Sequence, residues 1–239
     1  MSNPLKLLGG ASFRSFRNLW MLEELGVEYE HVSSALPASE EVKKWNPLGK
    51  VPVLIDYDLS STRRNENTTK TTSPPFVLYE SFAINNYLGE KYRSKNHHLI
   101  PSNLQERAIY DQTISVLISE LDAQGLWIHR KHQELGSMFT TIPDAVSHAR
   151  KYFHKTNRTL IQQLKESRGP YLLGEQFTAA DITYIHCLDW SSAIGWSGKW
   201  KSDPVVVEYT KLCKSRKSYQ TVKAIRDSEL KMMKESSKL

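Results

Sequence analysis

Two pairs of polar residues fall where a strand is expected to give way to a helix. Ser12 and Ser15 stand at the start of the first such helix, and Glu80 and Ser81 open another. A helix N-terminus carries free backbone N–H groups and the positive end of the helix dipole, so it favours an anion. Glu80 offers a carboxylate to a ligand amine, and Ser81 offers a hydroxyl to a ligand carboxylate. Each pair taken alone is more typical of helix capping than of a binding site.

A third segment, Lys50-Val51-Pro52, lies between these pairs and follows a turn. Pro52 lacks a backbone donor, so it should begin a strand or lie where no donor is needed. If the Val51–Pro52 peptide is cis, it displays the backbone of Val51 to a ligand instead of to a neighbouring strand. The joint spacing of the three segments within one α/β unit is much more specific than any one of them.

Other chemistries lack their residue patterns. His129 and His132 could share a helical face, but no carboxylate or cysteine completes a zinc-like set, so we expect surface histidines and no metal site. Cys187 is expected to be a small buried apolar residue inside a helix, and only Cys213 accompanies it, which excludes a disulfide scaffold. Phosphate-binding glycine loops and the nucleophile-elbow pattern are missing from the sequence.

The elements that must position the three segments follow from periodicity. Strands are expected over 5–8, 27–32, 51–55 and 76–79, and helices over 13–25 and 80–88. Gly26 should end the first helix. Residues 58–75 are polar, rich in Thr, Ser and Asn, and are expected to form a disordered loop without a catalytic role. Residues 1–92 therefore form one small α/β unit.

The remaining residues predict a different kind of domain. Residues 93–100 are expected to form a linker, and residues 101–239 an all-helical domain. Thr178 and Asp181 have the spacing of a capping box at the start of one of its helices. Apolar residues at helical spacing mark two further helices: Ile114, Leu117, Ile118 and Leu121 in the first, and Val146, Ala149, Phe153, Leu160 and Leu164 in the second.

The charge is concentrated in the second part of the chain. Of the net charge of +6 over 239 residues, residues 1–92 carry −1 and residues 93–239 carry +7. The last 29 residues hold nine basic and three acidic side chains but only one aromatic, Tyr219, so we expect a solvated helix and no nucleic-acid partner. Neither a membrane-spanning segment nor a secretory signal is evident, which predicts a cytoplasmic protein.

Four segments together resemble the cytosolic glutathione S-transferases, over essentially the whole chain. Arg14–Glu30 is similar to the first-helix signature of the Ser-type fungal and bacterial branch, and Asn46–Leu54 to the cis-proline segment. Tyr79–Ile84 is similar to the Glu-Ser glutathione motif, and Phe177–Ile182 to the capping box of the helical domain. The resemblance implies a thioredoxin-like α/β N-terminal domain, an all-α C-terminal domain, a homodimer, and glutathione as co-substrate.

The resemblance also implies residue roles. Glu80 would pair with the γ-glutamyl amine of glutathione and Ser81 with the adjacent carboxylate. Val51, beside the cis Pro52, would exchange backbone hydrogen bonds with the cysteinyl part, as in strand addition. Lys50 would lie near the glycyl carboxylate.

Thiol activation is assigned to Ser12. In Ser-type members the activating serine lies five residues before an arginine of the first helix, and counting back from Arg17 gives Ser12. Ser15 is the other candidate, although its place one turn further on better suits a structural hydroxyl that bonds the backbone. A free thiol has a pKa of ~8.5, and lowering it by ~2 units requires ~2.7 kcal/mol of stabilisation of the thiolate.

The expected activity is conjugation of glutathione to small hydrophobic electrophiles, as in detoxification. Phe13, Tyr110 and Trp127 are the expected lining of the electrophile pocket. One alternative is a glutathione-dependent isomerase of the maleylacetoacetate type, disfavoured because such enzymes favour Ser-Ser-Cys-Ser at positions 12–15. Another is a non-catalytic glutathione-binding regulatory module with the same fold. A Cys-type thiol transferase is disfavoured because residues 1–92 contain no cysteine.

Overall fold

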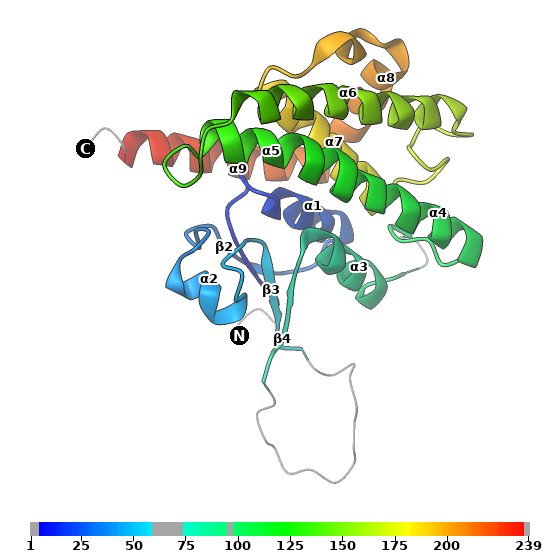
Figure 1. Ribbon diagram of the computed structural model, residues 1–239. Helices are drawn as coiled ribbons and strands as arrows, with labels where there is room; N and C mark the ends of the chain where they lie inside the picture. The colour runs from blue at the N-terminus through cyan, green and yellow to red at the C-terminus, as the bar shows by residue number, and fades with distance from the viewer. Residues whose placement is uncertain (1–4, 59–73, 95–97, 237–239) are drawn as a thin grey trace. The chain divides into compact units, whose positions relative to one another are not determined.

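The computed structural model describes residues 5–58, 74–94 and 98–236, and the chain folds into two compact units (Figure 1). The first unit comprises Met1–Tyr92 and Lys217–Leu239, and the second comprises Arg93–Arg216. The sequence-based division placed the last helix with the helical domain, whereas in the structure this helix packs within the first unit. Of the polar segment 58–75, which was expected to be disordered, residues 59–73 lie outside the described residues.

The first unit is built on a mixed four-stranded sheet in the order β2-β1-β3-β4. Strands β1 and β2 pair in parallel, while β3 is antiparallel to both β1 and β4. All four expected strands are present, with the bounds β1 Leu5–Leu8, β2 Glu30–Val32, β3 Val53–Asp56 and β4 Phe76–Tyr79. The α/β unit predicted from the sequence is therefore confirmed.

Four helices accompany the sheet: α1 Ser15–Leu25, α2 Glu40–Trp45, α3 Ser81–Lys91 and α9 Lys217–Ser236. Helix α1 ends as predicted at Gly26, whose φ of 63° is easy for glycine and whose N–H bonds the carbonyls of Leu22 and Glu23. Helix α2 was not predicted. It has only six residues, of which Val42 alone is a buried apolar side chain, so it shows no readable periodicity.

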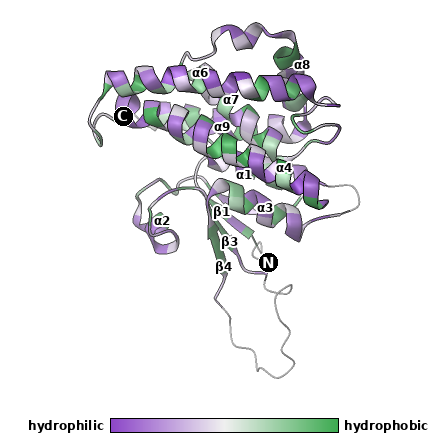
Figure 2. Ribbon diagram, turned by 45° about the vertical axis from the view of Figure 1, so that its right-hand side comes forward, coloured by the Kyte–Doolittle hydropathy of each residue, from purple (hydrophilic) through white to green (hydrophobic). Residues whose placement is uncertain are grey.

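The sheet has apolar cores on its faces because side chains alternate along each strand. On one face, Leu8, Val53 and Ile55 pack with Ala35 and with Val42 of α2. In Figure 1 α1 and α3 lie on the other side of the sheet from α2. Figure 2 shows the contrast in composition between the largely hydrophobic inner strands and the largely hydrophilic α2.

The second unit contains helices throughout its described regular structure, as predicted. Helices α4, η1, α5 and η2 follow one another without a break, with η1 and η2 wound as π-helix and η3 as a 3₁₀ helix. Their bounds, with those of the later helices, are α4 Leu104–Ser115, η1 Val116–Leu126, α5 Trp127–His129, η2 Arg130–Glu134, α6 Pro143–Glu166, α7 Ala179–Ala193, η3 Gly198–Ser202 and α8 Pro204–Lys214. The two predicted apolar faces are buried or nearly so.

The capping box predicted at the start of α7 is present. Thr178 Oγ1 accepts from the Ala180 N–H at 3.3 Å, and Asp181 Oδ2 accepts from the Thr178 N–H at 2.8 Å. Asp181 also reaches outside the helix, where its Oδ1 accepts from the Leu172 N–H and the Tyr209 hydroxyl, both at 2.9 Å. The carboxylate of Asp181 therefore joins three segments of the helical unit.

One of the two histidines considered as metal ligands is not at the surface. His129 is buried against Trp196, with ring centroids 5.1 Å apart, so the expectation of a surface histidine was wrong there. Burial lowers the pKa of His129, opposed by the charge of Glu134. Within the described residues, no three metal-ligating side chains cluster, and none of the helices has the length and apolar character needed to cross a bilayer.

Candidate functional site

The three predicted segments meet at one end of the sheet of the first unit. In the strand register, Leu8 at the end of β1 pairs with Val53 at the start of β3, and Val53 pairs with Tyr79 at the end of β4. Neighbouring strands lie about 4.8 Å apart, so the segments attached to these three residues are neighbours in space. The sheet thus brings together the serine turn, the Val51–Pro52 peptide and the start of α3.

The serine turn follows β1 and leads into α1. The Phe13 N–H donates to the Gly10 carbonyl at 3.1 Å, which places Ser12 in the middle of a tight turn. The hydroxyl oxygens of Ser12 and Ser15 are shielded from solvent and have no hydrogen-bond partner among the described residues. Neither serine caps α1, whose N-cap is Arg14. The expectation that Ser15 bonds the backbone was therefore wrong.

The two serines differ in their surroundings. Ser15 is fully buried against Gly9, where a Cβ atom would lie only 2.4 Å from Ser15 Oγ and 2.6 Å from Val51 Cβ. Ser12 is only partly buried as a residue. Ser15 is therefore the more deeply buried residue of the two, although both hydroxyl oxygens are shielded from solvent.

The Val51–Pro52 peptide is cis, as predicted. The turn before it is held by Asn46, whose Nδ2 donates to the Lys50 carbonyl at 2.8 Å and whose Oδ1 accepts from the Leu48 N–H at 3.0 Å. The side chain of Lys50 is exposed. A single buried asparagine therefore holds the turn that leads into the predicted binding segment.

Glu80 has an unusual backbone for its residue type. Its φ of 74° and ψ of 114° are rare for a side chain with a Cβ, and such conformations cost of order 1–3 kcal/mol and cluster at functional sites. Glu80 is exposed, and its side chain makes no capping hydrogen bond to α3 within the described structure. The capping interpretation of Glu80 is therefore not supported.

Ser81 is buried at the first position of α3 and is tied to α1. Its Oγ accepts from Arg17 Nη1 at 3.3 Å, and its carbonyl accepts from Asn18 Nδ2 at 2.8 Å. Asn18 Nδ2 also lies 2.6 Å from Asn85 Oδ1. These buried contacts fix the start of α3 relative to α1, and with it the backbone from which the exposed side chain of Glu80 extends.

One residue at this end of the sheet was missed by sequence reasoning. Glu229 of α9 is buried, and its carboxylate accepts from the backbone N–H groups of Ala11, at 2.7 Å, and of Ser12. Burial raises the pKa of Glu229, while these two amides and the charge of His31 act in the opposite direction. The basic composition of the tail concealed it. The available signal was Tyr219, Val222 and Glu229, which share one helical face.

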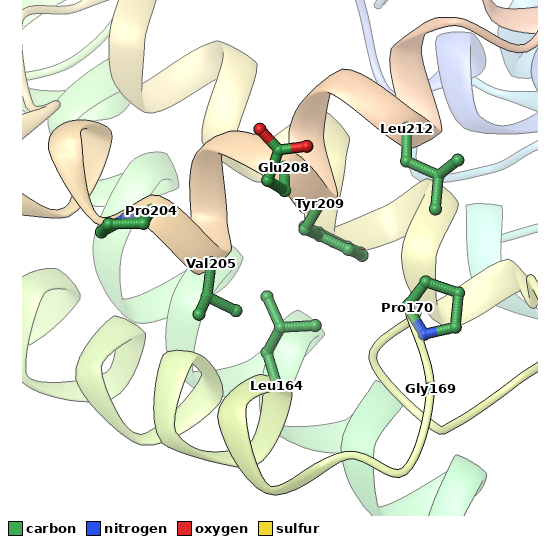
Figure 3. Close-up of a pocket in the computed structure, with 8 residues that line it drawn as sticks. All are labelled: Leu164, Gly169, Pro170, Pro204, Val205, Glu208, Tyr209 and Leu212. Carbon is green, nitrogen blue, oxygen red and sulfur yellow. The ribbon is translucent and has the colours of Figure 1, made fainter.

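A separate pocket lies wholly within the second unit. Its volume is about 480 Å³. Figure 3 shows that its lining comes from the end of α6, from α8 and from Pro170. None of the predicted site residues lines it. Tyr110, expected to line the electrophile pocket, is fully buried in the same unit, so that expectation was wrong, while Phe13 and Trp127 are partly buried in their respective units.

Comparison with known proteins identifies the family. A model of the glutathione S-transferase N-terminal domain matches residues 11–91, and a model of the C-terminal domain matches residues 143–211. The chain belongs to the glutathione S-transferase family. Glutathione S-transferase F14 of Arabidopsis thaliana is 27% identical over 207 residues, 79% of this chain and 69% of the relative. Glutathione S-transferase hmp2 of Hypomyces subiculosus is 28% identical over 211 residues, 83% and 88% respectively.

Solved structures agree on the fold. Ure2p5 from Phanerochaete chrysosporium, cocrystallised with 1-(S-glutathionyl)-2,4-dinitrobenzene, matches with a TM-score of 0.79 at 19% identity over 98% of this chain and 99% of that one. A glutathione S-transferase-I bound with lactoylglutathione matches with a TM-score of 0.70 at 26% identity over 93% and 99%. The predicted combination of a thioredoxin-like domain and an all-helical domain is confirmed, and this glutathione S-transferase is assigned as an enzyme.

Proposed function

We propose that this glutathione S-transferase joins the thiolate of glutathione to small hydrophobic electrophiles, with Ser12 as the activating hydroxyl of a Ser-type enzyme. The sulfur attacks an electrophilic carbon, a C–S bond forms, and the leaving group departs with its electron pair. The carrying observation is the Ser12 hydroxyl, whose oxygen is buried in the turn between β1 and α1 and has no hydrogen-bond partner in the described structure. A preorganised donor of this kind stabilises an anion without acting as a base.

The rest of the site has the polarity that glutathione requires. Glu80 presents an exposed carboxylate for the γ-glutamyl amine, and Ser81 with the N-terminus of α3 faces the adjacent carboxylate. The Val51 backbone beside Pro52 pairs with the cysteinyl part, and the exposed Lys50 ammonium attracts the glycyl carboxylate. The solved relative bound with lactoylglutathione supports glutathione as the ligand.

A direct assay tests the activity. With glutathione and a generic aromatic halide, we expect turnover above the uncatalysed rate at neutral pH. Calorimetry with glutathione alone should detect binding by the same preparation. Binding without turnover of any aromatic halide would contradict the proposed conjugation and favour a glutathione-binding module without catalysis.

Ser12→Ala should displace the pH–rate profile of kcat to higher pH. The lost hydrogen bond to the thiolate is charge-assisted, so the pKa of bound glutathione should rise by about one unit, equivalent to about 1.4 kcal/mol. The pH dependence of kcat reports groups in the enzyme–substrate complex, which makes it the profile to measure. Glutathione affinity should change little, because the hydroxyl favours the thiolate form over the thiol.

Ser15→Ala is the matched control. It removes a hydroxyl from the same turn that also lacks a partner in the described residues but is enclosed between Gly9 and Val51. We expect its profile to coincide with that of the wild type. A profile displaced only in the Ser15 variant would transfer the role to Ser15, and displacement in neither would assign the thiolate to backbone donors.

We also propose that the enzyme works as a homodimer in the cytoplasm, in keeping with its resemblance to the cytosolic members. Each unit exposes large apolar side chains, including Leu48 and Phe76 in the first and Leu104 and Ile109 in the second. Light scattering after size exclusion should give twice the chain mass of 27.5 kDa. A mass that stays at the single-chain value at micromolar concentration would contradict the dimer.

A further inference from the structure

Helix α9 is anchored antiparallel on α1, within the first unit. Tyr219 packs edge-on against Trp20, with ring centroids 4.9 Å apart, and Trp20 Nε1 donates to Ser218 Oγ at 3.2 Å. About two turns further along α9, the Arg226 guanidinium lies 5.1 Å from the ring centre of Phe16. Residues later in α9 therefore contact residues earlier in α1. Glu229, further along α9 than Arg226, accordingly lies beside the turn that precedes α1.

The Glu229 carboxylate fills a place that this turn leaves for it. Its Oε2 accepts from the Ala11 N–H at 2.7 Å, and the carboxylate also accepts from the Ser12 N–H. Gly10 provides the space, since a Cβ atom there would lie 3.0 Å from Oε2. The side chain of Glu229 is only 6% exposed. A buried carboxylate therefore satisfies the two amides at the centre of the turn that carries the Ser12 hydroxyl.

The other carboxylate oxygen has a different environment. Glu229 Oε1 is buried with no hydrogen-bond partner among the described residues, and His31 Nε2 lies 3.9 Å away. His31 Nε2 is itself 3.0 Å from the Gly9 carbonyl. The shortest contact of Glu229 is thus the one from the Ala11 N–H to Oε2, at 2.7 Å.

We propose that Glu229 is a positioning residue for thiol activation, holding the Ala11 and Ser12 amides so that the turn presents the Ser12 hydroxyl to the glutathione sulfur. This role rests on the proposed function of Ser12. Glu229 does not touch the reacting atoms and acts only through the turn. It makes the last helix of the chain, 218 residues away in sequence from Ala11, part of the catalytic machinery.

The test is steady-state kinetics with glutathione and an aromatic halide on four variants. Glu229→Ala should lower kcat by about tenfold or more and leave KM for glutathione within about twofold of the wild-type value. It should also displace the pH–rate profile to higher pH. Glu229→Gln keeps a carbonyl oxygen for the amides and should restore most of kcat. In a Ser12→Ala background, Glu229→Ala should cause little further loss, because both changes act on one hydroxyl. Glu235→Gln, an exposed glutamate on the same helix, should have no effect.

Several results would overturn the proposal. One is a rise in KM with unchanged kcat in Glu229→Ala. Another is a Glu229→Gln enzyme whose kcat is as low as that of Glu229→Ala. A third is a double variant whose fold-loss in kcat equals the product of the fold-losses of the two single variants. If Glu229→Ala does not fold, Glu229→Asp, one methylene shorter, replaces it with the same expectations. If the pH–rate profile is displaced in Ser12→Ala but not in Glu229→Ala, only the positioning role of Glu229 is contradicted. If the pH–rate profile of Ser12→Ala is not displaced, the proposed activation of the glutathione thiol by Ser12 is itself contradicted.

Discussion

Asp181→Ala should lower the free energy of unfolding of the helical unit by about 3 kcal/mol. The carboxylate accepts four hydrogen bonds from three segments: the Leu172 N–H, the Tyr209 hydroxyl, and both the N–H and the hydroxyl of Thr178. Each buried donor left without an acceptor costs about 1–3 kcal/mol. Part of this loss is recovered, because removing a buried charge also removes its desolvation cost. The same burial raises the pKa of Asp181, against the effect of its hydrogen bonds.

The measurement is thermal unfolding. For a protein of this size, a loss of about 3 kcal/mol should lower Tm by roughly 6–12 °C. Asp203→Ala is the matched control, since Asp203 caps α8 by accepting from the Val205 N–H at 3.1 Å, but at the surface. Losing such a cap costs about 1 kcal/mol. Equal Tm losses in the two variants would contradict the assigned role of Asp181, as would an Asp181 variant with normal unfolding and no catalysis.

The sequence predicted the elements whose signals are local. Apolar periodicity was enough for the four strands and for the long helices, and Gly26, Thr178 and Asp181 marked helix ends through capping chemistry that depends on neighbours in the chain. The cis peptide at Pro52 was expected from the resemblance of Asn46–Leu54 to the family's cis-proline segment, which is itself a short stretch of the chain. These features share one property: the residues that determine them lie within a few positions of one another.

Features that depend on contacts distant in sequence were not predicted. Glu229 was interpreted as one acid in a solvated basic tail, because nothing near it in the chain shows that it meets the Ala11 amide. His129 and Tyr110 were misjudged for the same reason, since burial depends on which helices cover them. The candidate site was predicted only in part. Its residues were named from motifs, but the backbone conformation of Glu80 and the tie from Arg17 to Ser81 came only from the fold.

Glu80 should show opposite effects of one substitution on stability and on binding. Glycine adopts a φ of 74° without the strain of about 1–3 kcal/mol that a residue with a Cβ carries, at an entropic cost of about 0.5–1 kcal/mol. Glu80→Gly should therefore stabilise the fold by up to about 2 kcal/mol. It should also weaken glutathione binding about ten- to hundredfold, since a hydrogen bond to a charged group contributes about 1.5–3 kcal/mol.

Two further variants separate the strain from the charge. Glu80→Gln keeps the strained backbone and loses only the charge, so calorimetry should show weaker glutathione binding with an unchanged Tm. Ala38→Gly relieves a similar positive φ of 65° at an exposed position outside the predicted site, so Tm should rise with glutathione affinity unchanged. If Glu80→Gly binds glutathione like the wild type, the Glu80 carboxylate does not hold the γ-glutamyl amine. If Glu80→Gly is less stable than Glu80→Gln, the conformation at Glu80 is not a source of strain, and its positive φ loses its value as a marker of the site.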